Sequence, residues 1–376
     1  MGSLLPRLSQ NRSAVWIATA IVGVALILLP FAFGLLGNAW VRALAFACLY
    51  VMLALGLNIV VGFAGLLDLG YIAFYAVGAY MYALLASPHL TSTFPWIAQM
   101  FPNGLHNSIW FVIPLGAGLA ALFGILLGAP VLKLRGDYLA IVTLGFGEII
   151  RIFLNNLNAP VNITNGPQGI TLIDPISFGN VSLAKTQQFL GITFPSVHLY
   201  YYLFLVLTLI TIVICVRLQD SRLGRAWMAI REDEIAAKAM GINVRNVKLL
   251  AFSLGATFGG VSGAMFSAFQ GFVSPESFTL NESIIVLAMV VLGGLGHIPG
   301  VVLGAVLLAI FPEVLRHTVT PVQTFLFGHV VIDAEVLRMM LYGLAMVLIM
   351  LYRPKGLWPA PEHGVNPSSR AAARGT

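Results

Sequence analysis

The sequence predicts an all-α, polytopic membrane protein, and three observations support this fold class. Hydrophobic residues make up 59% of the 376-residue chain and charged residues only 9%, with a mean hydropathy of +0.92. Apolar segments long enough to cross a bilayer recur along most of the chain. Basic residues gather in alternate connections between these segments. A soluble domain of this length would not tolerate such a composition.

About ten apolar segments have the length of a membrane-spanning helix, roughly 17–25 residues each. They lie near residues 15–36, 40–61, 70–86, 109–131, 138–156, 199–217, 248–269, 282–297, 300–316 and 335–352. The first of them follows Arg7 and Arg12 and so resembles a signal peptide. Because it is as long as a full span and lacks a small-residue cleavage site, we expect it to be retained as the first helix.

The distribution of basic residues predicts the orientation of these spans. Alternate threading from a cytoplasmic N-terminus places 15 of the 20 Lys and Arg residues on one side. They are Arg7, Arg12, Lys133, Arg135, the seven basic residues from Arg217 to Lys248, Arg353, Lys355, Arg370 and Arg374. The two loops predicted outside, 87–108 and 157–198, are nearly free of basic residues. We therefore expect both termini in the cytoplasm.

The second outer loop, 157–198, is long for a bare connection. It contains apolar residues that could pack, namely Ile170, Leu172, Ile173, Ile176 and Phe178. We expect this loop to fold over the outer mouth, where a partner could dock.

Glycine patterns predict both close packing and two irregular breaks. Glycines recur at about one-turn spacing in the fourth span (116–128) and the seventh (255–263), which lets helices approach closely. Two further glycine-rich stretches, VVGFAGLLDLG and VVLGGLGHIPG, interrupt apolar segments and approximately echo each other. Coincidence is the alternative to an internal repeat, because glycine is frequent in membrane helices.

These two breaks supply the candidate pathway or hinge residues. Irregular backbone is tolerated at membrane depth only where it is buried in protein or lines a cavity, and repeat-built transporters bind substrate at such places. The candidates are Gly62, Gly65, Asp68, Gly70, Gly293, Gly296 and Gly300. The sequence leaves open whether 62–70 enters the membrane as a half-helix or turns at its surface.

No motif for catalysis or cofactor binding is present. The sequence lacks GxxxxGK[ST], HExxH, GxSxG and paired-cysteine motifs, and its two cysteines, Cys48 and Cys215, lie far apart. We therefore expect no metal site and no enzymatic activity. The net charge of +6 reflects the distribution of charge across loops, so no nucleic-acid partner is predicted.

Charged groups within the membrane are costly and mark candidate sites. Glu148 and Arg151 lie three residues apart in the fifth span, where they can neutralise each other as an intramembrane ion pair. Asp68 could line a pathway or cap the short helix that follows it. Glu282 and Glu313 lie near the outer ends of their spans, and we interpret them as interfacial.

The only long polar segment is Ser221–Lys248. Residues 226–240 contain neither Pro nor Gly and predict one helix, in which Glu234 and Lys238 could pair at i,i+4. Gly241 is a plausible left-handed stop, and Asn243 could cap the next helix.

Two interpretations of this segment compete. A charged segment is usually a solvated loop, whose charges here would set topology. A docking helix for a soluble partner is the functional alternative. It is favoured by an alanine surface beside acidic residues and by apolar side chains that a solvated helix would not need. Those apolar residues are Trp227, Ile230, Ile235 and Met240.

The stretch EIAAKAMG at 234–241 resembles the EAA loop of the permease subunits of bacterial ABC importers. Here Ile235 is interposed, so the match is Glu-x-Ala-Ala with Gly four residues after the second Ala. Further stretches are similar to branched-chain amino-acid importer permeases of the LivM type, and the resemblance runs from about residue 15 to 359. They are GLNIVVGFAGLLDLGYIAFYAVGAYMYALL at 56–85, LRGDYLAIVTLGFGEIIRIFLNN at 134–156, NGPQGI at 165–170, SRLGRAWMAIREDEIAAKAMGIN at 221–243 and LGGLGHIPGVVLGA at 292–305.

This resemblance implies a complex in the bacterial inner membrane. The chain would pair with a homologous second permease subunit, two cytoplasmic ATPases and a periplasmic substrate-binding protein, surrounded by lipid. The ATPases would use ATP and Mg, and this chain would bind no cofactor. Leucine, isoleucine and valine would cross by alternating access. The alternatives are a urea or short-amide importer permease, or an ion-coupled secondary transporter, which would need several buried carboxylates.

The resemblance also assigns a domain division and a site. The expected parts are a cytoplasmic N-terminal segment (1–14), a permease domain (15–358) and a disordered cytoplasmic tail (359–376). Within the permease domain, residues of about 226–241 would form a coupling helix seated on an ATPase. Its contact residues would be Arg231, Glu232, Asp233, Glu234, Ala236, Ala237 and Gly241.

Overall fold

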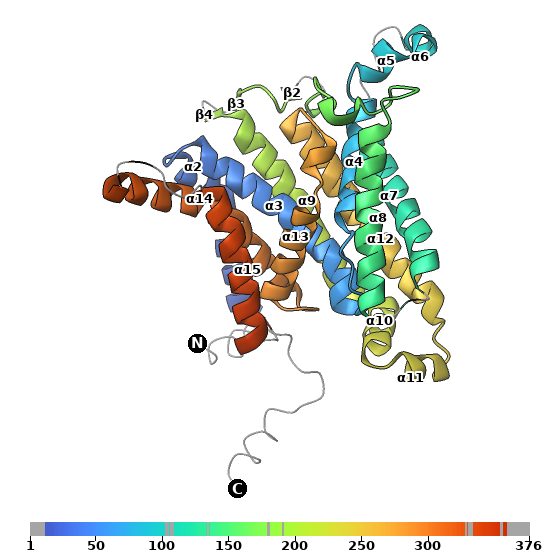
Figure 1. Ribbon diagram of the computed structural model, residues 1–376. Helices are drawn as coiled ribbons and strands as arrows, with labels where there is room; N and C mark the ends of the chain where they lie inside the picture. The colour runs from blue at the N-terminus through green and yellow to red at the C-terminus, as the bar shows by residue number, and fades with distance from the viewer. Residues whose placement is uncertain are drawn as a thin grey trace.

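The structure is a bundle of helices, seen here in a computed structural model (Figure 1). It describes residues 12–101, 105, 109–132, 134, 136–178, 181–189, 192–327, 329, 334–353 and 356–358. The longer helices are α2 (Arg12–Gly34), α3 (Asn38–Asn58), α4 (Ile72–Leu85), α7 (Ile109–Val131), α8 (Asp137–Asn156), α9 (Ser196–Gln219), α12 (Val244–Gln270), α13 (Leu280–Gly293), α14 (Ile298–Phe327) and α15 (Ala334–Tyr352). The expected all-α class is confirmed for the described residues.

Shorter elements connect or extend these helices. They are the π-helix η1 (Ile59–Phe63), the α-helices α5 (His89–Thr93), α6 (Pro95–Met100), α10 (Arg222–Glu232) and α11 (Glu234–Ala239), and the 3₁₀ turns η2 (Gly166–Gln168) and η3 (Pro275–Ser277). Two antiparallel hairpins pair β1 (Ser177–Phe178) with β2 (Val181–Ser182) and β3 (Gln187–Phe189) with β4 (Ile192–Phe194).

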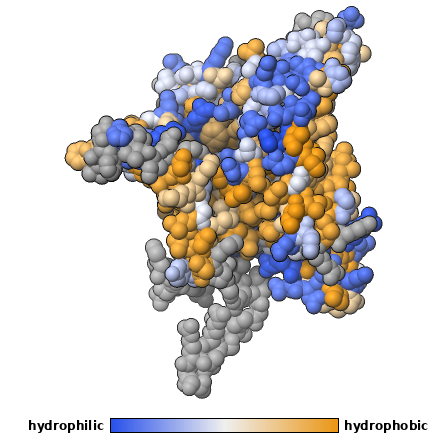
Figure 2. Space-filling model, viewed as in Figure 1, coloured by the Kyte–Doolittle hydropathy of each residue, from blue (hydrophilic) through white to orange (hydrophobic). Residues whose placement is uncertain are grey.

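Several helices are suited to a lipid bilayer. In the described part of the chain, six are long and apolar enough to cross one, and three shorter helices are also apolar. The six are Asn38–Phe63, Ile109–Val131, Ser196–Gln219, Val244–Gln270, Pro275–Gly293 and Ile298–Phe325. Figure 2 shows an apolar belt between two polar ends. The protein is therefore a multi-pass helical membrane protein.

The bundle has two distinct ends (Figure 1). We call one the α10 end, because α10 and α11 lie there, and the other the hairpin end, after the β-hairpins. The last turn of α15 also lies towards the α10 end. The described residues before α8, 132, 134 and 136, and the connection between α13 and α14 belong to the α10 end as well.

Helix α12 lies at the centre of the core, in contact with α3, α4 and α7. Its glycines bring backbones together: a Cβ atom on Gly78 of α4 would lie 2.0 Å from the carbonyl oxygen of Gly260. Likewise, a Cβ on Gly263 would lie 2.0 Å from the carbonyl oxygen of Tyr75. No side chain fits at these positions, so the close packing expected from the glycine spacing of the seventh span is confirmed. In the fourth span it does not extend to Gly118, where a Cβ would have no neighbour within 4 Å.

The loop 157–198 folds against the bundle at the hairpin end. Ile170, Ile173 and Ile176 are buried, and Ile170 pairs with Val273 through backbone hydrogen bonds of 2.8 and 3.0 Å. Leu172 is 75% exposed. The prediction that apolar residues pack this loop is thus confirmed for the isoleucines but wrong for Leu172, whose φ of 55° belongs to a left-handed turn. Phe178 is also exposed, at 36%.

Candidate functional site

The polar segment folds as two helices, so the prediction of one helix over 226–240 is wrong. Helix α10 ends at Glu232 and α11 begins at Glu234. Between them Asp233 has extended backbone, and its Oδ1 accepts hydrogen bonds from the backbone N–H groups of Ile235 (2.8 Å) and Ala236 (3.0 Å). The Asp233 carboxylate is therefore the N-cap of a new helix, which interrupts the first.

The end of α11 follows the sequence prediction. Gly241 has a φ of +85°, and Asn243 caps α12 by accepting a hydrogen bond from Asn246 N at 3.2 Å. Both predictions are confirmed. Glu234 accepts a hydrogen bond from Nζ of Lys248 at 2.9 Å, and this largely buried ion pair ties α11 to α12.

Of the four apolar side chains singled out in this segment, two are buried and two are exposed. Trp227 and Ile230 are buried, and the indole N–H of Trp227 donates to the Val247 carbonyl at 2.7 Å. Ile235 and Met240 are 73% and 83% exposed. Helix α10 is thus held against the bundle, while α11 presents apolar side chains outward.

The predicted contact residue Ala237 does not lie on that surface. Ala237 is only 4% exposed, because its side chain is buried within the chain itself. The exposed residues from 232 to 241, which we call the α11 surface, are Glu232, Asp233, Ile235, Ala236, Lys238, Ala239, Met240 and Gly241. The expected contact role of Ala237 is therefore corrected to a packing role.

Arg231 links α10 to both glycine-rich breaks. Its Nη1 donates to the carbonyl oxygen of Gly62 at 2.5 Å. A Cβ atom on Gly65 would lie 2.5 Å from Cγ of Arg231, and one on Gly296 would lie 2.9 Å from Nη1. Its Nη2 also lies 3.6 Å from Oε1 of Glu232. One side chain of the polar segment therefore contacts residues that are far apart in sequence.

The two breaks also contact each other. Asn58, which is buried, accepts a hydrogen bond from Gly296 N at 2.9 Å through Oδ1. A Cβ on Gly62 would lie 2.6 Å from Gly296 N, so the backbones of the two breaks are in contact. Gly62 lies within η1, a π-helix, and such elements are frequent at functional sites. Asn58 was not among the predicted residues, although a lone polar residue one turn before Gly62 was a signal for it.

The remaining glycines complete this cluster. A Cβ on Gly293 would lie 2.3 Å from the carbonyl oxygen of Gly300, which brings α13 and α14 together at their connection. A Cβ on Gly70 would lie 1.9 Å from the carbonyl oxygen of Thr143 on α8. The structure therefore gathers the predicted hinge glycines in contact with α8, α10, α13 and α14.

Asp68 shapes the backbone between η1 and α4. Its Oδ1 accepts a hydrogen bond from Gly70 N at 2.9 Å, and its other carboxylate oxygen has no hydrogen-bond partner within the described ranges. Residues 64–71 are not helical and α4 begins only at Ile72, so a helix capped by Asp68 and beginning at 69 or 70 is not observed. The segment 62–70 is thus no half-helix; it runs from a π-helix into a buried turn.

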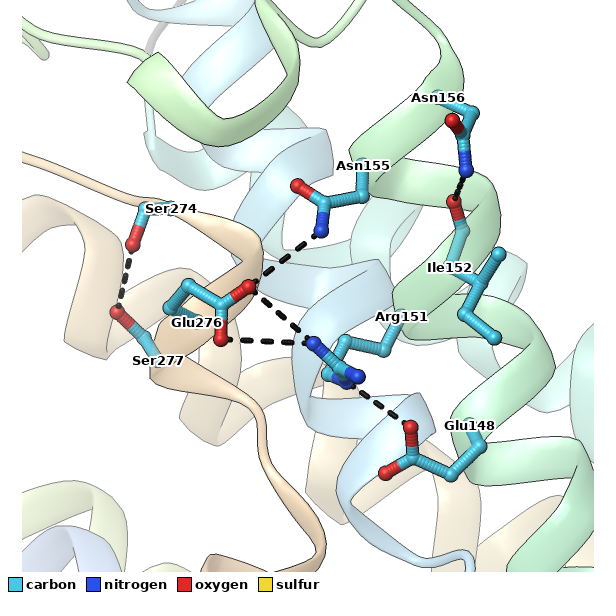
Figure 3. Close-up of polar contacts among 8 residues, drawn as sticks. All are labelled: Glu148, Arg151, Ile152, Asn155, Asn156, Ser274, Glu276 and Ser277. Carbon is cyan, nitrogen blue, oxygen red and sulfur yellow. Dashed lines mark hydrogen bonds and ion pairs between the residues drawn. The ribbon is translucent and has the colours of Figure 1, made fainter.

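A second polar cluster lies nearer the hairpin end, on α8 (Figure 3). Arg151 Nε lies 3.0 Å from Oε2 of Glu148, and its Nη1 lies 3.2 Å from Oε1 of Glu276 in η3. Asn155 donates to the same Glu276 oxygen at 3.4 Å. The Glu148–Arg151 pair therefore extends into a network that joins α8 to the segment after α12. Glu276 was missed because it lies 125 residues along the chain from Arg151.

A family model described as "branched-chain amino acid transport system / permease component" matches residues 39–350. No solved structure matches this chain. The match covers both glycine-rich breaks, the polar segment and the α8 cluster.

Three curated relatives illustrate the range of similarity. The high-affinity branched-chain amino acid transport system permease protein LivM of Escherichia coli (strain K12) is 43% identical over 323 residues, 83% of this chain and 68% of the relative. The probable branched-chain amino acid transport permease protein LivM of Methanocaldococcus jannaschii is 26% identical over 83% of this chain and 90% of the relative. The high-affinity branched-chain amino acid transport system permease protein LivH of Escherichia coli (strain K12) is 26% identical over 83% of this chain and 92% of the relative.

Proposed function

Because this chain belongs to the permease family of branched-chain amino acid transport systems, it is a permease subunit of such an importer, and we propose that ATP hydrolysis by partner subunits drives it. The proposal assigns no chemistry on the substrate to this chain. ATP and Mg are used by the partner ATPases, and this chain binds neither. The substrates are leucine, isoleucine and valine.

One observation carries the proposed coupling mechanism: Arg231 contacts both glycine-rich breaks from α10. We propose that an ATPase binds the α11 surface and displaces α10 when it closes. Through Arg231, that displacement reaches Gly62, Gly65 and Gly296, where the backbone is irregular and can bend. The bundle then rocks about the breaks, and the substrate gains access alternately to each side.

We also propose a topology of ten crossings with both termini in the cytoplasm. Support comes from the longer helices, which follow the ten predicted spans along the chain. The α10 end carries the seven basic residues from Arg217 to Lys248, and positive charge favours the cytoplasmic side. The α10 end is accordingly the cytoplasmic side of the inner membrane, and the hairpin end the outer side. Residues 15–358 form the permease domain in this scheme, while segments 1–11 and 359–376 lie outside the described residues.

The proposed partners are a homologous second permease subunit, two ATPases and an outer substrate-binding protein. Similarity to proteins named LivM and to proteins named LivH supports a pair of related permeases. An apolar groove of about 610 Å³ between α7 and α8, lined by residues such as Leu126, Ile141 and Ile149, suits a helix of the second permease or lipid. The binding protein would dock at the hairpin end, near the exposed Glu276 carboxylate.

Uptake by proteoliposomes tests the function. With the chain reconstituted together with its co-purifying subunits, leucine uptake is expected to require ATP and to be inhibited by isoleucine and valine but not by urea. An ionophore that dissipates ion gradients is expected to leave the uptake unchanged. Uptake of urea in place of leucine, or uptake that needs an ion gradient instead of ATP, would contradict the proposal in favour of the amide importer or the secondary transporter.

The α11 surface offers a separate prediction. The double variant Ile235→Ser with Met240→Ser is expected to weaken ATPase binding by roughly 100-fold, because two exposed apolar side chains would lose about 3 kcal/mol of burial in the interface. The measurement is the amount of ATPase that co-purifies at graded concentrations. Ala237 is unsuitable for this test, since its burial means that a polar substitution would disturb the chain's own packing.

Ala229→Ser is the matched control for this experiment. Ala229 is exposed on α10 and lies outside the α11 surface, so the variant should bind the ATPase like the unaltered protein. Equal binding by the double variant and the control would show that the ATPase docks elsewhere.

A further inference from the structure

A cavity of about 330 Å³ lies between α3, α13, α14 and α15, away from the glycine-rich breaks. It is formed by the first turns of α3 and α15 and by the part of α14 beyond Leu308. Since α3 and α15 run towards the α10 end, the cavity is nearer the hairpin end (Figure 1). Its size is at the lower end of the range for small-molecule sites.

The lining of the cavity changes from charged to apolar along α3, α14 and α15. Its charged residues, on the side of the hairpin end, are Arg42, Glu313, Arg316 and Arg338. Further towards the α10 end on neighbouring turns, the lining consists of Met289, Leu308 and aromatic rings. On α3, α14 and α15 the charged and the apolar lining residues are four to eight positions apart. At 1.5 Å per residue, this separates them by about 6–12 Å along each helix. The cavity therefore suits a short molecule with a charged head and an apolar tail.

Glu313 supplies a buried negative charge to this cavity. Its side chain is only 10% exposed. Oε2 lies 3.4 Å from Nη1 of Arg316. Nδ1 of His317 lies 3.3 Å from Oε1, but it also lies 3.0 Å from the backbone carbonyl of Glu313. When His317 Nδ1 donates its hydrogen to that carbonyl, Oε1 of Glu313 accepts no hydrogen bond from the described part of the chain.

Arg42 supplies a positive charge that is held in place. Its Nη2 donates to Oε1 of Gln270 at 2.5 Å, and its guanidinium lies over the rings of Phe46 (5.8 Å) and Phe269 (5.4 Å). A guanidinium has five N–H donors in a planar fork that matches a carboxylate, so a bond to Gln270 leaves donors for an anion. Charges of both signs thus line one end of the cavity.

We propose that this cavity binds an aliphatic α-amino acid. Its carboxylate would pair with Arg42, its ammonium group with Oε1 of Glu313, and its side chain would lie against Met289 and Leu308. A buried carboxylate oxygen without a hydrogen bond, Oε1 of Glu313, favours a cationic group in the ligand, and the guanidinium favours an anionic one. The identity of the ligand rests on the proposed function. The cavity would be a substrate site within the membrane, separate from the two glycine-rich breaks.

Zwitterionic phospholipid shares this head-group chemistry, so the experiment must separate the two sources. The probe is photo-leucine, an amino acid with a diazirine in its side chain, applied to the full chain with its co-purifying subunits. Illumination is expected to label peptides within 280–293 and 298–317, and excess leucine should suppress the labelling. Glu313→Gln and Arg42→Gln are each expected to lower it about tenfold or more, since each removes a charged hydrogen-bond partner.

Asp220→Asn is the matched control, because Asp220 is an exposed carboxylate at the far end of α9 and should leave labelling unchanged. Arg42 is exposed, so its variant tests the site even where Glu313→Gln lowers the yield of folded protein. Labelling that is confined to other segments, or that excess leucine does not suppress, would overturn the proposal. So would native mass spectrometry that finds a phospholipid lost from Glu313→Gln while leucine labelling is unaffected.

Leucine uptake measured on the same preparation separates this inference from the proposed function. ATP-dependent uptake without cavity labelling would contradict the site alone. Labelling that leucine suppresses, without ATP-dependent uptake, would contradict the importer mechanism and leave the site standing.

Discussion

Replacing Arg231 with alanine is expected to lower leucine uptake at least tenfold while the associated ATPase continues to hydrolyse ATP. The variant removes the hydrogen bond to the Gly62 carbonyl and the packing on Gly65 and Gly296. A hydrogen bond from a charged group contributes about 1.5–3 kcal/mol, which corresponds to roughly 10–150-fold in an equilibrium. Without it, α10 can move while the two breaks stay as they are.

Uptake and ATP hydrolysis measured in the same proteoliposomes test this result. Arg231→Lys keeps the charge but not the planar fork, so partial uptake is expected. Arg222→Ala is the control, because Arg222 is an exposed arginine at the opposite end of the same helix. Uptake by Arg231→Ala at the level of this control would rule out Arg231 as the connection between the ATPase and the breaks.

Gly78→Ala is expected to destabilise the bundle by about 3 kcal/mol or more. The added methyl group would lie 2.0 Å from the carbonyl oxygen of Gly260 and 2.5 Å from its Cα. These are backbone atoms, which cannot rotate away as a side chain could, so α4 and α12 must separate along their contact. We expect a loss of folded protein, measured as the monodisperse fraction that survives graded heating in detergent.

Gly118→Ala is the matched control for this prediction. Gly118 also lies in a transmembrane helix, α7, but a Cβ there would have no neighbour within 4 Å. The variant should change stability by less than about 0.5 kcal/mol. Equal heat resistance of the two variants would mean that α4 and α12 do not touch through Gly78.

Much of the fold was accessible from local pattern. The predicted spans coincide with helices because a span must be apolar over its whole length, and that property is read directly from consecutive residues. Gly241 and Asn243 end one helix and begin the next through hydrogen bonds to residues three positions away. The Asp233 cap was equally local, but the absence of Pro and Gly over 226–240 concealed it.

The site was accessible only in part. The two glycine-rich breaks and the polar segment were recognised separately, yet the contact between Arg231 and Gly62 joins residues 169 positions apart. The same holds for Glu276, which completes the Arg151 network, and for Glu313, whose burial depends on how α14 packs against its neighbours. No periodicity in the sequence records such pairings.

The sequence by itself determined the membrane fold class, the positions of the long helices and the position of the polar segment, because hydropathy and capping depend on neighbouring residues. Only the tertiary structure decided which parts of that segment are anchored and which are exposed, that Ala237 is buried, and that Arg231 reaches both breaks. The physical reason is that glycines at 62, 65 and 296 leave room for another chain segment without specifying which one. The packing of α10 against η1 fills that room with the side chain of Arg231.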